Sequence, residues 1–417
     1  MHIGYACLTV AVEGAKIRNC TLKTASPERL MALAGENLYA LERMIDYNIS
    51  NNIRLYRISS DLVPFGSSLA AGLPWDSFFM PQITRIAEKI RRSGMRVSMH
   101  PGQYTVLNSP DGGVVHRAMR DLSYHARVLD ALGLGVSHKI ILHVGGKYGD
   151  AISARTRFAA AFRDLDPAVS RRIALENDGS IFNISEVLDL CCAIGAPAVY
   201  DNLHNAIHPA DPLKSDDHWV SLCRATWNPS DGAQKTHYSQ QDPDKPRGAH
   251  SETVSISRFL EYDHGISGEK PDIMLEVKDK NRSAVKCQLC LSPPDQRLME
   301  TEWGRYKYCV LERSPEAYGE IRAMLKDKRG DSAIAFYTLV ERALALPENK
   351  GRALNALEHV WGYFPECASK AEARRYAALR DGFAAGAVPL GQVKRLLYRF
   401  AQQYRQDYLL GSYYFLN

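Results

Sequence analysis

Short apolar segments recur along the chain, and six of them end on a histidine or an acidic residue before an amphipathic stretch begins. These segments are 95–100, 139–143, 172–176, 198–204, 234–237 and 273–276. Parallel barrel strands have this pattern, because they are buried on both faces and present polar side chains at the open end of the barrel. The pattern therefore predicts buried strands whose ends carry the chemistry.

Amphipathic helices are predicted between the strands, as where Leu30, Leu33, Leu38 and Leu41 follow Ser26-Pro27 at helical spacing. Strands are expected at 2–8, 53–59, 95–100, 139–144, 172–176, 198–201, 233–238 and 273–277, and helices at 28–52, 81–93, 115–132, 153–165, 183–194, 214–225 and 252–262. This alternation, without a glycine-rich phosphate fingerprint, favours a closed (β/α)8 TIM barrel over an open doubly wound sheet. The predicted class is α/β, with the barrel over residues 1–284.

A smaller all-α domain is expected over residues 285–417, since 417 residues suit a barrel of about 250 residues plus an appendage. Ser292-Pro-Pro-Asp-Gln predicts a linker, and helical patterns follow at 314–328, 331–346, 350–362, 370–383 and 390–407. Aromatic residues close the chain at Tyr404, Tyr408, Tyr413, Tyr414 and Phe415. They are expected to pack in a helical core, with stacking on nucleic-acid bases as the alternative.

Charge and histidine are distributed unequally between the two regions. Of 52 Lys and Arg and 47 Asp and Glu, the region after residue 284 holds 20 and 15, so it carries the whole net charge of +5. It holds one of the 13 histidines, His359. We therefore expect the chemistry in the first region and, in the second, an accessory domain of at most mild attraction to a polyanion.

The location of the protein is predicted to be cytoplasmic, without a membrane partner. No run of eighteen apolar residues occurs, and the N-terminal residues lack the regions of a signal peptide. Nine cysteines without an export signal indicate reduced thiols. Cys287 and Cys290 form a CxxC pair. We interpret them as plain thiols because the other possible zinc ligands, Cys309 and Cys367, are single and distant. Structural zinc is the alternative.

A multinuclear metal site is the interpretation of the repeated strand endings. One histidine at the end of a strand is more often packed or hydrogen-bonded than metal-bound. Six similar endings, each at the end of a barrel where active sites lie, favour metal ligation.

The motifs at these strand ends resemble those of the UV damage endonucleases, metal-dependent DNA repair enzymes related to the endonuclease IV type. The resemblance covers roughly residues 1–280 and rests on eight motifs in order: 56–60 (YRISS), 100–104 (HPGQY) with 107–108 (LN), 142–146 (LHVGG), 175–178 (LEND), 200–205 (YDNLHN), 235–239 (KTHYS), 248–250 (GAH) and 275–278 (LEVK). It implies incision of double-stranded DNA immediately 5′ to UV photoproducts and related lesions, leaving 3′-hydroxyl and 5′-phosphate ends.

The resemblance implies a centre of three divalent ions, Mn first, with Zn, Co or Mg as alternatives. The implied ligands are His100, His143 and Glu176 for one ion, Glu176, Asp201, His237 and Glu276 for the central ion, and His204 and His250 for the third. Lys235 stands where the family's lysine can be carboxylated to an anionic ligand, with an ordinary solvated charge as the alternative. The residues expected to carry catalysis are Glu176, Lys235, His237 and Glu276.

Damage recognition is implied for the loop after the third strand. Gln103 and Tyr104 are expected to enter the duplex while damaged nucleotides leave it, with Asn108 and Tyr5 also contacting the lesion. A packed tyrosine is the alternative for Tyr5. Some family members carry a histidine shortly after the second strand, where this chain has Ser68. The role of that histidine is therefore lost here or supplied by another residue, for example Asp61.

Two other functions compete with this hypothesis. An abasic-site endonuclease is the nearest, and a metal-dependent sugar isomerase belongs to another reaction class. The pair His204 and His250 and the loop 101–108 argue against the isomerase. The C-terminal region resembles a helical domain of unknown function, and this resemblance names no activity. We expect a monomer that acts on damaged DNA.

Overall fold

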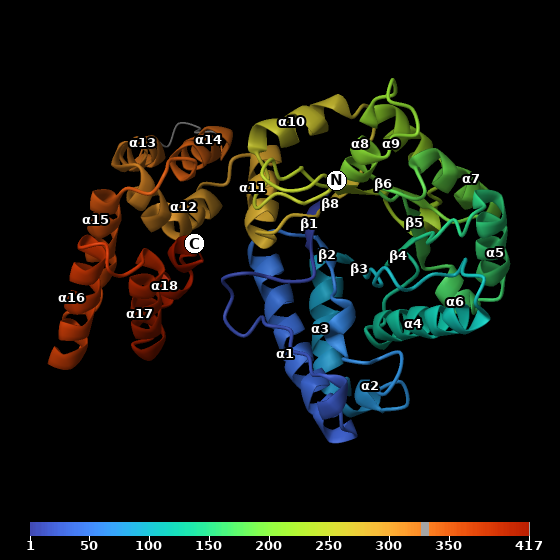
Figure 1. Cartoon of the computed structure of the whole chain (residues 1–417), viewed down its shortest axis with the longest axis horizontal. Coiled ribbons are helices and arrows are strands. Elements are labelled where there is room, and N and C mark those ends of the chain that lie inside the picture. The colour runs from blue at the N-terminus through green and yellow to red at the C-terminus, as the bar shows by residue number, and fades with distance from the viewer. Residues whose placement is uncertain (327–332, 417) are drawn as a thin grey trace. The chain divides into compact units, whose positions relative to one another are not determined.

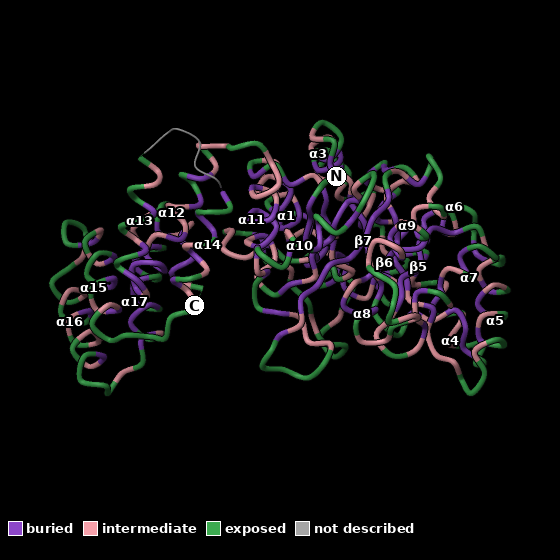
Figure 2. The backbone as a smooth tube through the Cα atoms, turned by 90° about the horizontal axis from the view of Figure 1, so that it is seen from above, coloured by how far each residue is buried: buried purple, intermediate pink, exposed green. Residues whose placement is uncertain are grey.

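All eight expected strands form in the computed structural model, which describes residues 1–326 and 333–416. They are β1 (Ile3–Ala6), β2 (Leu55–Arg57), β3 (Arg96–Ser98), β4 (Ile140–His143), β5 (Ile173–Glu176), β6 (Ala198–Asp201), β7 (Lys235–Tyr238) and β8 (Asp272–Leu275). Each has three or four residues, and nearly all are buried (Figure 2). Their parallel pairing gives the order β3-β2-β1-β8-β7-β6-β5-β4.

A bridge between Met99 and Ile140 joins the two ends of this order. The amide of Met99 donates to Lys139 O at 3.0 Å, and the amide of Ile141 donates to Met99 O at 2.9 Å. The predicted TIM barrel is therefore confirmed, and the carboxyl ends of all eight strands gather at one end of it (Figure 1).

Helices surround the strands, and the seven expected ones form, whereas α11 (Asn281–Leu291) was not expected (Figure 1). The longer ones are α1 (Pro27–Ser50), α3 (Met80–Ser93), α4 (Gly112–Ala131), α5 (Ala151–Arg163), α7 (Ile184–Ile194), α9 (Asp216–Arg224), α10 (Ile256–Gly265) and α11 (Asn281–Leu291); the short ones are α2 (Trp75–Phe78), α6 (Pro167–Ser170) and α8 (Asn202–Ile207). Their boundaries follow local chemistry: Ser26 caps α1 before Pro27, and a capping box of Asn183 and Glu186 begins α7.

The chain divides into a barrel unit, residues 1–10 and 14–288, and a helical unit, residues 11–13 and 289–417. The expected boundary after residue 284 falls inside α11, which continues to Leu291 before Ser292-Pro-Pro. Cys287 and Cys290 lie on this helix, and neither belongs to a group of three potential metal ligands among the described residues.

The helical unit contains α12 (Gln296–Arg313), α13 (Pro315–Lys326), α14 (Ala333–Leu344), α15 (Lys350–Trp361), α16 (Lys370–Ala384), α17 (Leu390–Gln403) and α18 (Asp407–Leu410). Helix α12 was not expected, because its apolar residues are mixed with charged ones that are themselves buried. Glu302 and Glu312 on α12 are buried: Glu302 accepts a hydrogen bond from Tyr337 at 2.9 Å, and Glu312 pairs with buried Lys394 at 2.8 Å. Of the terminal aromatics, Tyr413 and Tyr414 pack in the core as expected, whereas Tyr408 is exposed. No helix in the described part of either unit is long and apolar enough to span a bilayer.

Candidate metal centre

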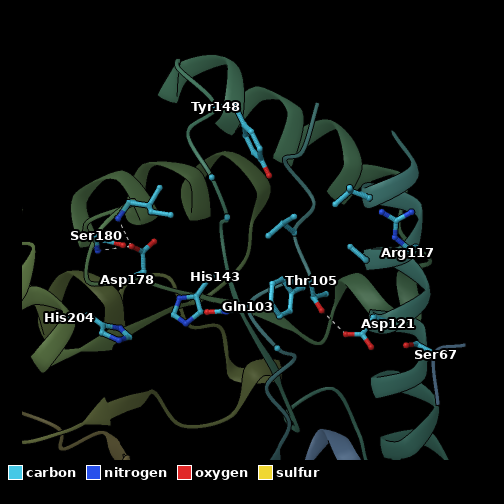
Figure 3. A pocket seen from close by; sticks show the side chains of 18 residues that line it. Ser67, Gln103, Thr105, Arg117, Asp121, His143, Tyr148, Asp178, Ser180 and His204 are labelled. Atoms are coloured by element: carbon cyan, nitrogen blue, oxygen red, sulfur yellow. Dashed lines mark hydrogen bonds between the residues drawn. The ribbon is translucent and has the colours of Figure 1, made fainter. Parts of the chain in front are cut away.

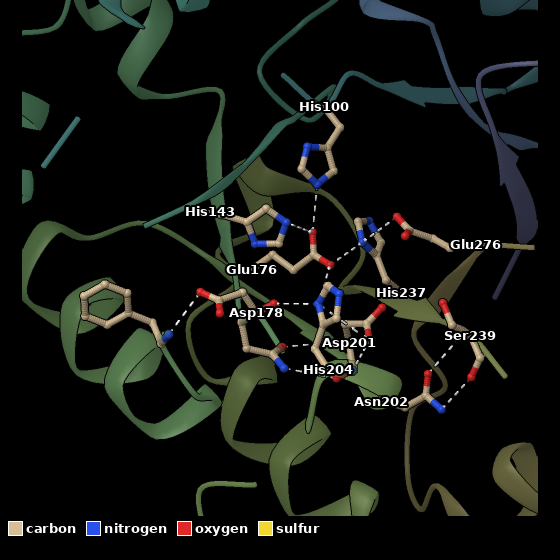
Figure 4. A network of polar contacts seen from close by, with 12 residues as sticks. His100, His143, Glu176, Asp178, Asp201, Asn202, His204, His237, Ser239 and Glu276 are labelled. Carbon is tan, nitrogen blue, oxygen red and sulfur yellow. Dashed lines mark hydrogen bonds and ion pairs between the residues drawn. The ribbon is translucent and has the colours of Figure 1, made fainter. Parts of the chain in front are cut away.

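The Glu176 carboxylate, at the end of β5, is the point on which the strand-end histidines converge (Figure 4). Its Oε2 lies 3.0 Å from His100 Nε2 and 3.8 Å from His143 Nε2. Its Oε1 lies 2.9 Å from His237 Nδ1 and 3.5 Å from His204 Nδ1. Glu176 is only 1% exposed, so one buried carboxylate faces four imidazoles from four strand ends.

Asp201 and His204 are placed together by the junction of β6 and α8. Asp201 is the N-cap of α8, and its Oδ1 accepts the amide hydrogen of His204 at 2.7 Å, which brings the two side chains close. Asn177 holds this junction to β5, because its side-chain oxygen accepts from the Asp201 amide at 2.8 Å and its side-chain nitrogen donates to Asp201 O at 3.1 Å. A similar amide bridge from Asn202 to Ser239 holds β6 to the end of β7 (Figure 4).

Backbone carbonyls orient two of the imidazoles. His204 Nδ1 donates to Asn177 O at 2.8 Å, and His100 Nδ1 to Pro101 O at 3.0 Å. In the neutral form of each ring, this hydrogen bond keeps the proton on Nδ1 and leaves Nε2 able to bind a cation, the usual arrangement of metal-ligating histidines.

Arg57 at the end of β2 fixes Glu276, which follows β8. Arg57 Nη1 donates to Glu276 Oε1 at 2.5 Å, and each side chain is 12% exposed. The same carboxylate lies 3.3 Å from His237 Nδ1 and 3.9 Å from His250 Nε2. Arg57 was not singled out from the sequence, although it belongs to the 56–60 motif and, like the ligands, is a charged residue at the end of a strand.

The protonation states at pH 7 suit cation binding for most of these groups. Burial favours a raised pKa of Glu176, but His237 and His143 outweigh it and hold the pKa far below its usual range. Burial lowers the pKa of His100 to about 4, so its ring is neutral. Burial lowers the pKa of His204, but Asp201 and Glu176 outweigh this and raise it to about 9, so this ring must release a proton before it binds a metal ion.

Several buried polar atoms of the site have no hydrogen-bond partner among the described residues. They are Glu176 Oε1, Asp201 Oδ2, His143 Nδ1 and both ring nitrogens of His237. His237 Nδ1 and Glu176 Oε1 lie 2.9 Å apart without the geometry of a hydrogen bond. Buried polar atoms are rarely left unpaired, and imidazole with carboxylate is a donor set that divalent transition metals accept. The residues therefore fit a metal centre.

Among the residues that the structure describes, two groups of donors are close enough to hold one ion each. His100, Glu176 and His237 form one, and Glu176, Asp201 and His204 form the other, with the donor atoms of each group within 4.8 Å. Both include Glu176, the residue expected to bridge. The grouping differs from the implied partition, which paired His237 with Asp201 and His204 with His250.

Lys235 occupies the beginning of β7, two residues before His237, and is fully buried. Residues two apart on a strand point to the same face, so Lys235 lies one layer below His237 in the barrel. Burial, with the positive charge of Arg96, lowers its pKa well below the ordinary value.

A cavity of about 920 Å3 opens beside the metal centre (Figure 3). Its lining includes His143, His204, Gln103 and Tyr104, with Gln103 beside His143 (Figure 3). Tyr104 is 85% exposed, while its neighbour Thr105 donates to Asp121 Oδ2 on α4 at 2.6 Å. The Tyr104 side chain is therefore exposed to solvent, while Thr105 next to it is held to α4.

Asn108 and Tyr5 are buried and contact other parts of the barrel unit. Asn108 donates to Gly146 O at 2.7 Å and links the Gln103 loop to the segment after β4. Gly145 needs to be glycine there, since its φ is +105° and a Cβ would lie 2.4 Å from Asn108 Oδ1. Tyr5 is 0% exposed, and its hydroxyl bonds to Thr9 and donates to Asn48 of α1.

The expected lesion contact of Tyr5 is therefore not supported, because Tyr5 packs between β1 and α1 and is not among the residues that line the cavity. Asp61, suggested as a substitute for the missing histidine, is exposed and accepts from Asn19 at 3.2 Å. Ser68 is exposed, whereas its neighbour Ser67 lines the cavity.

The fold and these donors define a TIM-barrel enzyme with a candidate multinuclear metal site at the carboxyl ends of its strands. Residues 1–300 match the family described as UV-endonuclease UvdE, and the chain belongs to this family. The chain is 37% identical over 354 residues to the UV DNA damage endonuclease of Clostridium perfringens (strain 13 / Type A), covering 84% of each protein. It is 31% identical over 268 residues to the UV DNA damage endonuclease of Bacillus velezensis (strain DSM 23117 / BGSC 10A6 / LMG 26770 / FZB42), covering 62% of this chain and 81% of the relative.

A solved structure of the same family agrees with the barrel. The crystal structure of SacUVDE matches with a TM-score of 0.65 and 33% identity, over 69% of this chain and 96% of that one. Residues 307–417 match a protein family of unknown function, DUF1722. The expectation of a DNA repair endonuclease with a C-terminal domain of unknown function is confirmed at this level.

Proposed function

We propose that this protein incises duplex DNA immediately 5′ to UV photoproducts and related lesions, by metal-dependent hydrolysis that leaves 3′-hydroxyl and 5′-phosphate ends. The observation that carries the proposal is the Glu176 carboxylate, which lies within 4 Å of the rings of His100, His143, His204 and His237. Such a cluster of neutral and anionic donors at the mouth of a barrel suits several adjacent cations.

Three divalent ions are proposed, with Mn as the first candidate and Zn, Co or Mg as alternatives. The proposed ligands are His100, His143, Glu176, Asp201, His204, His237, His250 and Glu276. Bound divalent ions would supply charge neutralisation at the phosphate, a water of lowered pKa and stabilisation of the leaving 3′-oxygen. The chain's part is to hold these donors: Arg57 orients Glu276, Asn177 orients His204, and Pro101 O orients His100.

Lys235 is proposed to be carboxylated and to act as a further anionic ligand. Its burial on the same strand face as His237 places its amine in the barrel interior, out of bulk water. Intact mass measurement of the native protein tests this modification: the carboxylated form is about 44 Da heavier than expected from the sequence, and Lys235→Arg must remove the extra mass.

Recognition is assigned to Gln103 and Tyr104. They line the cavity beside His143 and His204, so side chains that enter the duplex lie next to the chemistry. Flipping damaged nucleotides costs least where a lesion has already weakened stacking. Asn108 supports this loop from below through Gly146. We infer that the enzyme works as a cytoplasmic monomer on nucleoid DNA.

Incision of labelled duplexes tests the function directly. Three substrates are compared: one with a single pyrimidine dimer, one with an abasic site and one undamaged, each labelled in turn at either end. The proposal requires a metal-dependent cut 5′ to the dimer, abolished by chelator and restored by Mn2+. Cleavage confined to the abasic duplex would instead make the protein an abasic-site endonuclease.

A further inference from the structure

The positive charge of the molecule is concentrated on two neighbouring helices of the helical unit, α16 and α17, which pack against each other (Figure 1). Residues 370–405, which contain both helices, hold eight Lys and Arg against two Asp and Glu. This basic hairpin has a net charge of +6, whereas the whole chain has +5, so all other residues together carry −1. The excess therefore belongs to one hairpin and is not spread over the C-terminal region.

Helix α17 presents an exposed face without any carboxylate. Its apolar residues and Lys394 are buried in the unit. The residues on the opposite face are all neutral-polar, aromatic or cationic: Gln392, Arg395, Tyr398, Arg399, Gln402 and Gln403. At one edge of the face, Gln403 donates to Glu372 Oε1 of α16 at 3.0 Å. Arg395 and Arg399 are one turn apart and so lie side by side at the centre of this face.

Several arginines elsewhere in the helical unit have acidic partners. Arg342 lies 2.6 Å from Glu320, and Arg352 lies 3.8 Å from Glu316. Within the hairpin, Arg380 pairs with Glu358 of α15 at 3.0 Å and with Asp381 at 2.8 Å. No ion pair forms among the described residues for the remaining exposed cations of α16 and α17, which are Lys370, Arg374, Arg375, Arg395 and Arg399. Their charges are available to an external anion.

We propose that the basic hairpin is a second DNA-contacting surface that binds the phosphate backbone of duplex DNA without regard to sequence or damage. Guanidinium groups suit phosphates because their planar fork donates two hydrogen bonds. Glutamine and tyrosine beside them add neutral donors, as at many backbone contacts. Residues 1–284 cannot supply this attraction by net charge, since they carry equal numbers of acidic and basic residues.

An anionic membrane fits this face less well. A helix that lies on a membrane inserts an apolar face beside its cations. The apolar face of α17 is buried in its own unit, and only Tyr398, 38% exposed, projects a large apolar side chain from the face described above. The surface is therefore polar and cationic, which is the character of a nucleic-acid backbone site.

Binding of an undamaged duplex by the full-length protein tests this proposal. The variant Arg395→Gln/Arg399→Gln is compared with Arg322→Gln/Arg342→Gln, which removes the same charge from α13 and α14 of the same unit. All four arginines are exposed, so thermal unfolding should be unchanged. Fluorescence anisotropy with a labelled duplex, in chelator and across a salt series, gives the affinity and its salt dependence.

Two lost phosphate contacts should weaken binding by roughly 30-fold at about 0.15 M salt and reduce the slope of log K against log salt by about 2. The control variant should bind nearly as the wild type does. Arg395→Lys/Arg399→Lys should restore most of the affinity, because it keeps the charge.

The proposal is overturned if the hairpin variant binds like the control, or if its loss of affinity does not depend on salt. It is also overturned if the variant loses binding to vesicles containing phosphatidylserine while its DNA affinity is unchanged. These results are separate from the incision assay, because an undamaged duplex and chelator exclude cutting. If the protein does not incise dimer-containing DNA, the proposal that the basic hairpin binds DNA is unaffected. If the hairpin variant binds DNA normally, the proposed metal centre is unaffected.

Discussion

Arg57 offers a direct test of how the barrel holds its acidic ligands together. Arg57→Gln removes the cation that lies 2.5 Å from Glu276, in a pair whose side chains are each 12% exposed. At that distance and an effective dielectric constant of about 20, the Coulomb attraction is about 7 kcal/mol. Desolvation of both charges offsets part of it, and removing one partner of such a pair costs roughly 3–5 kcal/mol.

This cost should depend on metal. In chelator, Glu276 is left as an uncompensated carboxylate near Glu176 and Asp201, so we expect the barrel unit to lose about 3 kcal/mol or more of its free energy of unfolding. With Mn2+ bound, the cations replace the missing charge and the loss should be smaller. Arg57→Lys keeps the positive charge but loses the planar guanidinium group, so its loss of unfolding free energy should lie between those of the wild type and Arg57→Gln.

Urea unfolding monitored by hydrogen exchange of strand peptides measures this, because it follows the barrel separately from the helical unit. Arg155→Gln is the control, since Arg155 forms an ion pair with a mostly exposed partner, Asp189, at 3.2 Å and should cost under about 1 kcal/mol. The reasoning is refuted if Arg57→Gln in chelator costs no more than this control, or if Mn2+ leaves the difference between wild type and variant unchanged.

Three further predictions concern the site and the domains. Glu176→Gln should lower metal content, measured by elemental analysis, and abolish incision while circular dichroism stays native; full metal content with wild-type cleavage would contradict the bridging role. Gln103→Ala or Tyr104→Ala should reduce the preference for damaged over intact duplex, measured by competition binding, by about 1–3 kcal/mol with metal content unchanged. A fragment of residues 1–291 should fold, bind metal and cut dimer-containing DNA, with weaker affinity that recovers relative to full length as salt rises; a folded, metal-loaded but inactive fragment would show that the helical unit takes part in catalysis or substrate loading.

The fold and most of the candidate ligands were predictable because parallel barrel strands have a strong local pattern. A buried strand needs an apolar run, and closure of the barrel brings every carboxyl end to one rim, so polar residues at those ends must meet whatever the loops do. Glu176 and His237 are 61 positions apart in the sequence, yet the strand pattern alone places them together. The pair Asp201 and His204 is local, since one caps the helix that carries the other.

The tertiary structure determined the side-chain pairings that no local sequence pattern predicts. Arg57 and Glu276 are 219 positions apart. The alternation of buried and exposed residues along one strand does not predict which charged side chain of another strand it will pair with. Tyr5 could face the lesion or a helix by its position alone, and packing against α1 decided for the helix. Helix α12 was hidden because Glu302 and Glu312 are buried, with Tyr337 and Lys394 of other helices and Arg305 of α12 itself as partners. The excess charge of the C-terminal region was visible in the composition, but its concentration into an exposed face required the burial of α17, because only packing determines which side of a helix meets solvent.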